Sequence, residues 1–468
     1  MTGLPHPALD LTLELLESLT PWRSDASDPA RQRDLAAWLE QWLVDEVEAR
    51  VVLPVADQPL TAPPLVHARI DVGAAVTVVL YNRYDVAPAA PEGWEVDPFL
   101  GGVRHWPQWG DVFIARGAQK HKGPLAGMLM TVRDLWQNGL LHVNLEIVLE
   151  GEQACGSATL RRYLAQASCP IPPAEAVLFP AFCEQEGGVP RVYLGFTGMT
   201  QGAVRVKGGD WGGPRSAIDA SHAAWVASPA WRLVEALNAI APAQANGVLE
   251  TRPLDVEAAE WLDELAQQCN PEAQLGQNAR LALNASAYEA LAHLLGSAVL
   301  TISELKTASG GQDVIAPEAC AAFTLRTPPG SDPQALLARL RERLMLPDLV
   351  GAELHCGESY PGMRFSAEEP GVMELLMSYQ QQQARAQIWP WSPECAPASA
   401  FAPVAPAFVM GGLGSGGNAC GVNEFITLKG LARFQVPPPP ARGSELCPLS
   451  PMAPWRGETL RCDGHNPD

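Results

Sequence analysis

Short apolar segments rich in β-branched residues alternate with a helical segment over residues 76–179, and this alternation limits the folds open to the chain. We predict buried strands at Val76–Tyr81, Leu145–Glu150 and Ala176–Phe179, with a helix at Gly123–Leu135. Residues 8–50 repeat leucine and tryptophan at helical spacing. Strands separated by helices are typical of an α/β domain with a mixed, mostly parallel sheet.

The pattern changes near Gly198, where strands and helices follow in another order. We expect, in turn, a strand at Gly202–Lys207, a helix at Pro229–Ile240, strands at Val299–Leu305 and Cys320–Arg326, a helix at Pro333–Leu344 and a strand at Ala352–Cys356. This order predicts an inserted α+β domain of the ferredoxin-like βαββαβ type. A helix at Val372–Gln383, an apolar segment at Ala407–Met410 and a glycine-rich loop at Gly411–Gly417 would return to the first domain.

The composition argues against several classes of function. Asp and Glu total 52 against 32 Lys and Arg, and this net charge of −20 makes nucleic-acid binding an unlikely role. No apolar run approaches the roughly 18 residues that span a bilayer, and we see no signal peptide at the start of the chain. The ten cysteines include no C-x-x-C pair. We therefore expect a cytoplasmic protein with reduced thiols, no membrane contact and no nucleic-acid partner.

Five polar motif blocks follow one another along the chain. They lie at 81–86 (YNRYDV), 93–99 (GWEVDPF), 115–123 (ARGAQKHKG), 149–157 (LEGEQACGS) and 412–426 (GLGSGGNACGVNEFI). In this order and spacing they resemble the zinc peptidases that include carnosinase, succinyl-diaminopimelate desuccinylase and glutamate carboxypeptidase, known as peptidase family M-twenty. The resemblance covers about residues 10–435.

The resemblance implies a division of the chain into domains. Residues 1–197 and 359–436 would form a phosphorylase/hydrolase-like zinc-peptidase domain, and residues 198–358 an inserted lid or dimerisation domain. Residues 437–468 begin with four prolines and are expected to form a disordered Pro-rich tail. The resemblance also implies a homodimer that forms through the inserted domain.

In that family two zinc ions share a bridging carboxylate and a bridging water, and a Glu beside them acts as general base. The resemblance places other residue types at the matching positions. The ligand positions hold Arg83, Lys120, Ala154, Ala181 and Cys420, and the base position holds Gln153. Among these side chains only the Cys420 thiolate is a zinc ligand. Zinc would be the family's cofactor, but we predict no cofactor and no metal site for this chain.

Some substrate-side features of the family are kept. His222 matches a His that reaches a substrate carbonyl across the dimer interface, and Arg326 matches an Arg that contacts a substrate carboxylate. Gly414 and Gly416 lie in the stretch that lines the pocket. His222 is equally compatible with a packed or surface histidine, and Arg326 with a structural ion pair.

Asp85 matches the carboxylate that orients a zinc-binding His in the family. We expect Arg83 and Lys120 to neutralise leftover carboxylates such as Asp85 or Glu152, or to attract a small anionic ligand. Cys420 and His121 could form a relic metal site or a nucleophile pair. Both interpretations have little support, because one Cys and one His without a third group make neither a metal site nor a catalytic site.

The leading hypothesis is a catalytically inactive family member that serves as a binding or regulatory subunit. Its partner would be an active paralogue, or its pocket would take a small peptide or carboxylate compound. The alternative is an active hydrolase of amide bonds in dipeptides or N-acyl amino acids, or a metal-free enzyme that uses the old cleft. A third possibility is an interaction protein that acts through its Pro-rich tail.

Overall fold

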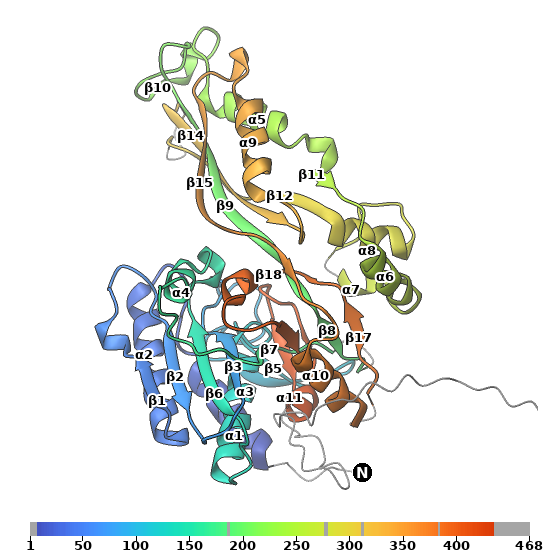
Figure 1. Cartoon of the computed structure of the whole chain (residues 1–468). Helices are drawn as coiled ribbons and strands as arrows, with labels where there is room; N and C mark the ends of the chain where they lie inside the picture. The colour runs from blue at the N-terminus through green and yellow to red at the C-terminus, as the bar shows by residue number, and fades with distance from the viewer. Residues whose placement is uncertain (1–6, 185–187, 276–278, 310–312, 382–383, 435–468) are drawn as a thin grey trace, which may run out of the picture.

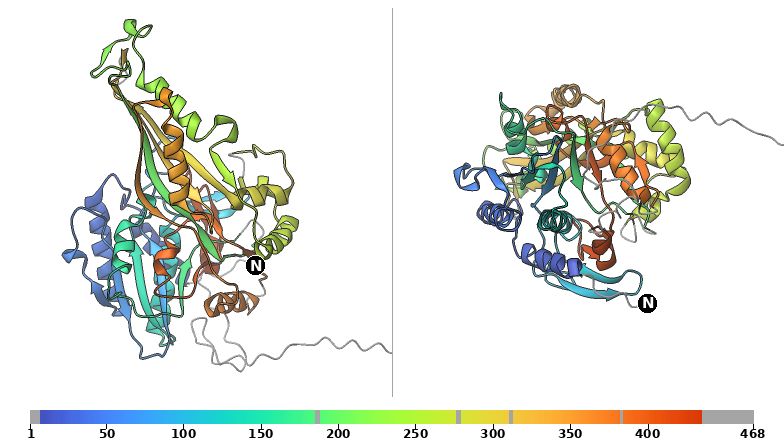
Figure 2. Two further views of the ribbon diagram at one scale, coloured as in Figure 1. Left: turned by 45° about the horizontal axis from the view of Figure 1, so that its top comes forward. Right: turned by 60° about the horizontal axis from the view of Figure 1, so that its bottom comes forward.

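A computed structural model describes residues 7–184, 188–275, 279–309, 313–381 and 384–434. The Pro-rich tail, 437–468, lies outside the described residues. The described chain forms a layered α/β domain from which a second sheet extends to one side (Figures 1 and 2). Among the described residues, no helix has the length and apolar character that crossing a membrane requires.

The first domain is built on an eight-stranded sheet. The strand order is β1 (Arg50–Leu53), β2 (Val66–Ile70), β6 (Asn144–Glu150), β3 (Thr77–Arg83), β7 (Ala176–Pro180), β19 (Phe408–Gly411), β8 (Arg191–Tyr193) and β17 (Gln387–Trp389). Four neighbouring strands run parallel to one another: β6, β3, β7 and β19. β2 pairs antiparallel with both β1 and β6, and β8 pairs antiparallel with β19. The mixed, mostly parallel sheet is confirmed, because the predicted strands supply its centre.

Helices cover both faces of this sheet, since alternate residues of each central strand point to opposite faces. Val78 and Leu80 of β3 share one core with α1 (Pro7–Leu19), α2 (Pro29–Val47) and α3 (Lys122–Gln137). Val79 and Tyr81 share the other core with α4 (Ala158–Leu164). α10 (Pro370–Gln381) packs beside β7 and β19. These are the almost continuous apolar strands expected for a doubly covered sheet.

A small sheet of order β20 (Gly416–Gly417), β21 (Phe425–Thr427), β5 (Gly110–Ile114) and β4 (Gly102–Trp106) joins the motif blocks at 115–123 and 412–426. It was not predicted, and part of the expected glycine-rich loop is its strand β20. α11 (Leu428–Phe434) follows β21 directly.

β9 (Gly195–Lys207) continues from the first domain into the second sheet, where its neighbours are β14 (Glu318–Thr327) and β15 (Ala352–Tyr360). β12 (Ser297–Thr307) pairs with β14, and β11 (Val248–Thr251) lies at the edge, which gives the order β11-β12-β14-β9-β15. β16 (Met363–Arg364) and β18 (Ser392–Cys395) also pair with the first part of β9.

Helices α5 (Pro229–Ile240) and α9 (Pro333–Leu344) pack on the second sheet and have the predicted bounds. Both begin with Pro at the first helical position, where its missing N–H group costs nothing. The Asp332 carboxylate caps α9 by accepting hydrogen bonds from the backbone N–H groups of Gln334 and Ala335. Such local signals explain why these two helices could be located from the sequence.

Three helices between the expected strands were missed: α6 (Val256–Gln268), α7 (Pro271–Leu275) and α8 (Ala287–Gly296). Leu262 of α6 and Leu291 of α8 are buried together with Trp389 of β17. Residues of this helical insertion therefore pack with the core of the first domain, although they fall within the range expected for the inserted one.

Candidate functional site

The candidate site lies where β3 and β6 end and the loops after these strands meet β18. Arg83 is the last residue of β3 and pairs in register with Glu150, the last residue of β6. Arg83 is only 2% exposed. The parallel strands bring both side chains to one edge of the sheet, as is general for ligand sites in open α/β folds.

The Arg83 guanidinium has partners on several sides. Its Nε donates to the Tyr81 hydroxyl at 3.2 Å and an Nη donates to the Cys395 carbonyl at 3.0 Å. Its central carbon lies 4.8 Å from the centre of the Phe179 ring, a cation–π distance. Burial by itself lowers the pKa of Arg83, but Tyr81 and Glu150 outweigh it and raise the pKa above its ordinary value. Arg83 is therefore a fixed, permanently charged group.

Glu150 is the carboxylate beside this cation. It accepts hydrogen bonds from the Tyr81 hydroxyl and, at 3.1 Å, from the Ser157 hydroxyl, while its Oε2 atom is buried without a hydrogen bond. Burial raises its pKa to about 7, although Tyr81 and Arg83 act in the opposite direction. This residue is a titratable group near neutral pH inside the site.

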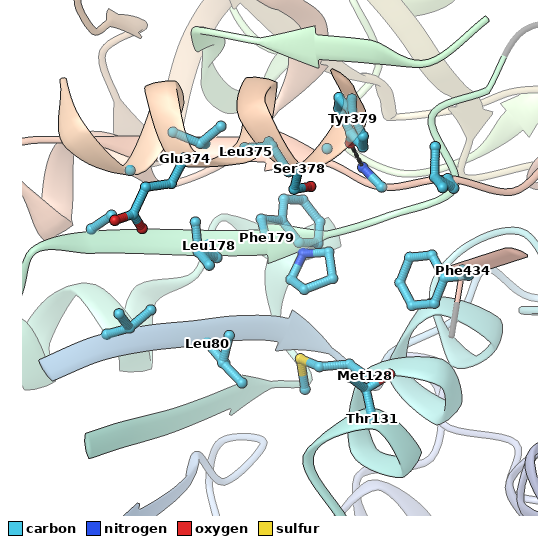
Figure 3. Close-up of a pocket in the computed structure, with 18 of the residues that line it drawn as sticks. Leu80, Met128, Thr131, Leu178, Phe179, Glu374, Leu375, Ser378, Tyr379 and Phe434 are labelled. Atoms are coloured by element: carbon cyan, nitrogen blue, oxygen red, sulfur yellow. Dashed lines mark hydrogen bonds between the residues drawn. The ribbon is translucent and has the colours of Figure 1, made fainter. Parts of the chain in front are cut away.

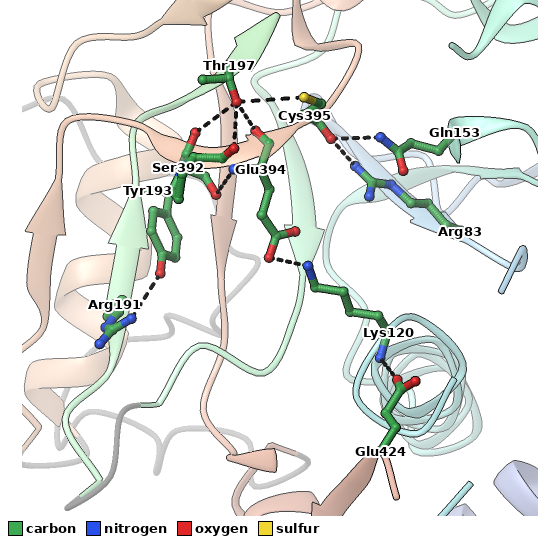
Figure 4. Close-up of polar contacts among 11 residues, drawn as sticks. Arg83, Lys120, Gln153, Arg191, Tyr193, Thr197, Ser392, Glu394, Cys395 and Glu424 are labelled. Atoms are coloured by element: carbon green, nitrogen blue, oxygen red, sulfur yellow. Dashed lines mark hydrogen bonds and ion pairs between the residues drawn. The ribbon is translucent and has the colours of Figure 1, made fainter. Parts of the chain in front are cut away.

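Lys120 forms an ion pair that crosses the site (Figure 4). Its Nζ lies 2.5 Å from an oxygen of Glu394, which belongs to β18. Burial opposes both charges, yet the pair raises the pKa of Lys120 and lowers that of Glu394. Thr197 of β9 fixes the same segment by donating to the backbone carbonyls of Pro393 and Glu394.

The backbone at Lys120 is held from the opposite side by Glu424. This buried carboxylate accepts the N–H groups of Gln119 at 3.0 Å and Lys120 at 2.7 Å, and pairs with Arg116 at 2.6 Å. Two of the motif blocks and the β18 segment thus meet around Lys120, which fixes the direction in which its side chain leaves the loop.

Gln153 and Asp85 also reach this cluster. The Gln153 amide donates to the Cys395 carbonyl at 2.9 Å, so that carbonyl accepts from both Gln153 and Arg83 (Figure 4). Asp85 accepts the backbone N–H of Ala154 at 3.2 Å, and its Oδ1 is buried without a partner. Burial raises the pKa of Asp85 despite the nearby Arg83 charge.

The expected neutralisation pattern is therefore only partly right. Among the described residues Lys120 pairs with Glu394, and Asp85 accepts a backbone N–H, with no ion pair to Arg83 or Lys120. Glu152 instead accepts the backbone N–H of Thr159 at the start of α4. The sequence prediction paired the cations with carboxylates of the motif blocks, whereas the fold supplies Glu394 from another segment.

A cavity of about 60 Å³ lies beside the ion pair. Its wall includes Asn82, Lys120, His121, Ala181 and Glu394, so the expected position of Ala181 beside Lys120 is consistent with the geometry. Burial, together with the charges of Arg83 and Lys120, lowers the pKa of His121 well below its ordinary value. A space of this size holds a few waters.

Cys420 lies in a turn with a positive φ of 59°, within range of the Lys120 charge. Burial raises the pKa of its thiol. Within the described ranges no three His, Cys, Asp or Glu residues are placed so that they could hold a metal ion together. His121 and Cys420 both lie near Lys120 but do not form such a group.

The remaining predicted residues lie farther out. His222 is exposed on a short 3-10 helix, Ala220–His222; its Nδ1 accepts from the Trp225 indole at 3.1 Å and the two rings stack. Arg326 donates to the Thr301 hydroxyl at 3.3 Å, and its charge contributes to lowering the pKa of Glu394. Arg326 therefore approaches the site, whereas His222 in this single chain does not.

The two glycines shape the wall of the site. Gly414 has a φ of +95°, and a Cβ atom there would lie 2.7 Å from the Gly430 carbonyl oxygen. A Cβ on Gly416 would lie 2.1 Å from the side-chain oxygen of Gln119. Both positions require glycine for close approach, which is a packing role.

Sequence reasoning missed Glu394, Glu150 and Tyr81. Glu150 stands at the end of a predicted strand, so its position at the sheet edge was available as a signal. Glu394 offered none, because it lies in a short strand of irregular pairing with β9.

The first domain, with its site at the carboxyl edge of the sheet, has the α/β fold of solved metallopeptidase structures. The chain belongs to the family described as Peptidase family M20/M25/M40, whose model matches residues 79–434.

Comparisons with individual proteins agree with this assignment. Solved structures with the same fold include the metallo-carboxypeptidase Sso-CP2 from Sulfolobus solfataricus, with a TM-score of 0.73 and 21% identity over 91% of this chain and 96% of that one. The di-peptidase Dug1p from Saccharomyces cerevisiae has a TM-score of 0.75 and 17% identity over 92% and 95% of the two chains. Human carnosine dipeptidase 1 has a TM-score of 0.72 and 18% identity over 91% and 95%.

A cysteinylglycine-S-conjugate dipeptidase from Corynebacterium striatum is 28% identical over 193 residues. That match covers 39% of this chain and 41% of the relative, so the aligned part spans less than half of either protein. These similarities establish the fold and the family, and they leave the activity of this chain to its own site residues.

Proposed function

We propose that this family member does not hydrolyse peptide bonds and acts as a binding or regulatory subunit. The observation that carries the proposal is the Lys120–Glu394 ion pair, in which a cation occupies the position that the family resemblance gives to a metal-bridging carboxylate. A bridging ligand for two dications must be an anion. An ammonium group would repel them, by several kcal/mol at ~4 Å and an effective dielectric of ~20.

The other side chains at these positions do not fit a pair of zinc ions. Arg83 stays charged and is bound to the Cys395 carbonyl, so it offers no lone pair. Ala154 and Ala181 have no ligand atom, and Gln153 has no carboxylate to accept a proton from water. Cys420 alone could ligate zinc, and one ligand does not hold two ions.

The ligand that we propose is a small carboxylate compound or peptide terminus. Arg83 and Lys120 already have partners within the protein. A free carboxylate would therefore bind by displacing Glu394 from Lys120, near Arg326. Because Lys120 and Glu394 are each about one-third exposed or less, solvent reaches the pair and exchange is feasible. Binding of N-acetyl amino acids, measured by calorimetry, should strengthen in Glu394→Gln and weaken in Lys120→Met.

Zinc content and dipeptide hydrolysis test the loss of catalysis. Purified protein that is incubated with zinc and then dialysed should carry far less than one equivalent of the metal, and should not cleave a panel of dipeptides. About two equivalents of zinc by elemental analysis, together with hydrolysis that a chelator abolishes, would show that the proposal is wrong.

The alternative is an active hydrolase of dipeptides or N-acyl amino acids. It is favoured by the names of the relatives, which are dipeptidases and a carboxypeptidase. Metal-free hydrolysis in the old cleft would use Glu150, a titratable carboxyl near neutral pH. Chelator-resistant hydrolysis that Glu150→Gln abolishes would support this alternative.

We also infer a homodimer that forms through the second sheet. β12 carries exposed Ile302 and Leu305 and pairs only its first residues with β11, which leaves an open edge. Trp231 is 74% exposed on α5. Trp231→Ser should lower the sedimentation-derived mass toward that of one chain, while Trp106→Ser, outside this sheet, should not. An active paralogue would be a second partner for the same surface.

A cytoplasmic location accompanies this proposal. All eight cysteines in the described ranges are free thiols, as expected for a reducing compartment.

A further inference from the structure

An apolar groove lies on the face of the central sheet between α3 and α10 (Figure 3). It has a volume of about 220 Å³. Leu80 of β3 and Leu178 of β7 form its floor, Met128 of α3 and Leu375 of α10 form its walls, and Phe434 closes one end. The groove lies on the face of the sheet, outside the Arg83–Lys120 cluster, so its occupancy is independent of the proposed function.

The end of the groove opposite Phe434 is acidic. Glu374 of α10 lies there, and Glu175 just before β7 also lines the groove (Figure 3). Neither carboxylate has an ion-pair partner within the described ranges, whereas Arg433, the only cation in the described lining, pairs with Glu184 at 2.8 Å. Burial, and secondly Glu175, raises the pKa of Glu374 to about 7. A cation at this end would be stabilised by both carboxylates.

The chain itself leaves the described structure at this groove. α11 ends at Phe434, whose ring lies against Gly127 of α3, Gly412 and Phe182. The next eight residues are Gln-Val-Pro-Pro-Pro-Pro-Ala-Arg, at 435–442. Proline has no N–H group, so a run of prolines can cover an apolar surface without burying unpaired donors. Arg442 follows the apolar stretch directly.

We propose that residues 435–442 lie in this groove, with Pro437–Pro440 over its apolar floor and Arg442 beside Glu374 and Glu175. The lengths agree. The four steps from Pro437 to Ala441, at ~3.1 Å per residue, span ~12 Å. The strand from Ala176 to Pro180, which runs along the floor, rises ~13 Å at ~3.3 Å per residue. The segment thus starts at the Phe434 end of the groove. Its prolines match the apolar floor, and Arg442 matches the acidic end.

The first test compares the full chain with a chain that ends at Phe434, which keeps every residue that lines the groove. The probe is the fluorescence of 1-anilinonaphthalene-8-sulfonate, with hydrogen exchange of α10 as the second measurement. We expect the shortened chain to bind several-fold more dye and to exchange faster in α10. Equal dye binding and equal exchange in the two chains would overturn the proposal.

The second test addresses the ionic contact in the full chain. Arg442→Glu should speed exchange in α10, and Arg456→Glu, a charge reversal in the same tail beyond the segment, should not. Adding Glu374→Arg to Arg442→Glu should restore the slow exchange. An equal effect of both reversals, or no restoration in the double variant, would contradict the assignment of Arg442.

The same experiments recognise a different occupant. If α10 is protected only at high protein concentration, and equally with and without residues 435–468, a second copy of the chain fills the groove and the proposal is wrong. Sedimentation of both chains at the two concentrations identifies that outcome.

Discussion

The carboxyl edge of the central sheet buries polar groups that have partners, whereas the groove on its face leaves apolar side chains beside open space. At the edge, Arg83, Lys120, Gln153 and Glu394 are tied together by charged and backbone contacts. On the face, Leu178 and Leu375 border an apolar space that the described side chains leave open. Buried polar groups cost several kcal/mol if unpaired, whereas an apolar wall beside an empty space loses only weak dispersion contacts. Disrupting the edge should therefore cost more than altering the groove.

The largest expected effect is that of Arg83→Ala. It removes a fully buried cation and leaves the Cys395 carbonyl and Glu150 with fewer partners. We expect a loss of about 3–5 kcal/mol in the free energy of unfolding, measured by urea titration. Arg326→Ala, at an exposed position, is the control and should change it by less than about 0.5 kcal/mol. A loss below about 1 kcal/mol in Arg83→Ala would contradict the expectation that disrupting the sheet edge costs more stability than altering the groove.

The pH dependence of stability should report Glu150. Its pKa rises from 4.5 to about 7 on folding, so the folded state holds its proton more tightly than the unfolded state. Stability is then full below the unfolded pKa and falls as the pH rises from about 5 to 8, by about 3 kcal/mol at most. Glu150→Gln should flatten this decline in urea titrations across that range. Glu374, whose pKa is also raised to about 7, contributes in the same window, so the decline should flatten further in Glu150→Gln with Glu374→Gln.

Glu394→Gln should have a smaller effect. It leaves the Lys120 ammonium without its partner, but the pair is partly exposed, with 27% and 36% of the side chains accessible. We expect a loss of about 1 kcal/mol that shrinks at high salt. The charge exchange Lys120→Glu with Glu394→Lys should recover most of it in the same thermal or urea measurement. A salt-independent loss would indicate a packing role for Glu394.

The smallest effect should arise in the groove. In the chain that ends at Phe434, Leu375→Ala removes a side chain that borders open space, and we expect a loss below about 1 kcal/mol. Leu129→Ala on α3, at a fully buried position outside the groove, should cost about 2–5 kcal/mol. In the full chain, where we propose that residues 435–442 fill the groove, Leu375→Ala should cost more. An equal loss in the two chains would contradict that proposal.

Much of the first domain could be located from the sequence because its signals are local. The central strands are continuous apolar segments. In the second domain, α5 and α9 both begin with Pro and α9 is also capped by Asp332, and the bounds of these two helices were predicted as observed. The helices α6 and α8 carry local signals too, the Asp255 cap and the Ser286–Glu289 capping box, and these signals were overlooked. Their packing with Trp389, far away in the chain, could not be read from the sequence. The strands β4, β5 and β21 meet only in the folded state.

The sequence by itself determined the family, the positions of the central strands β3, β6 and β7 along the chain, and the placement of Arg83 and Lys120 at the site, since ordered motif blocks survive changes in their individual residues. Only the tertiary structure decided which group pairs with each charged side chain of the site. Lys120 meets Glu394 and Arg83 meets the Cys395 carbonyl because β18 pairs with β9 and is thereby brought over the edge of the sheet. Ion pairing depends on distance in space, and that distance is set by the packing of segments widely separated in the chain.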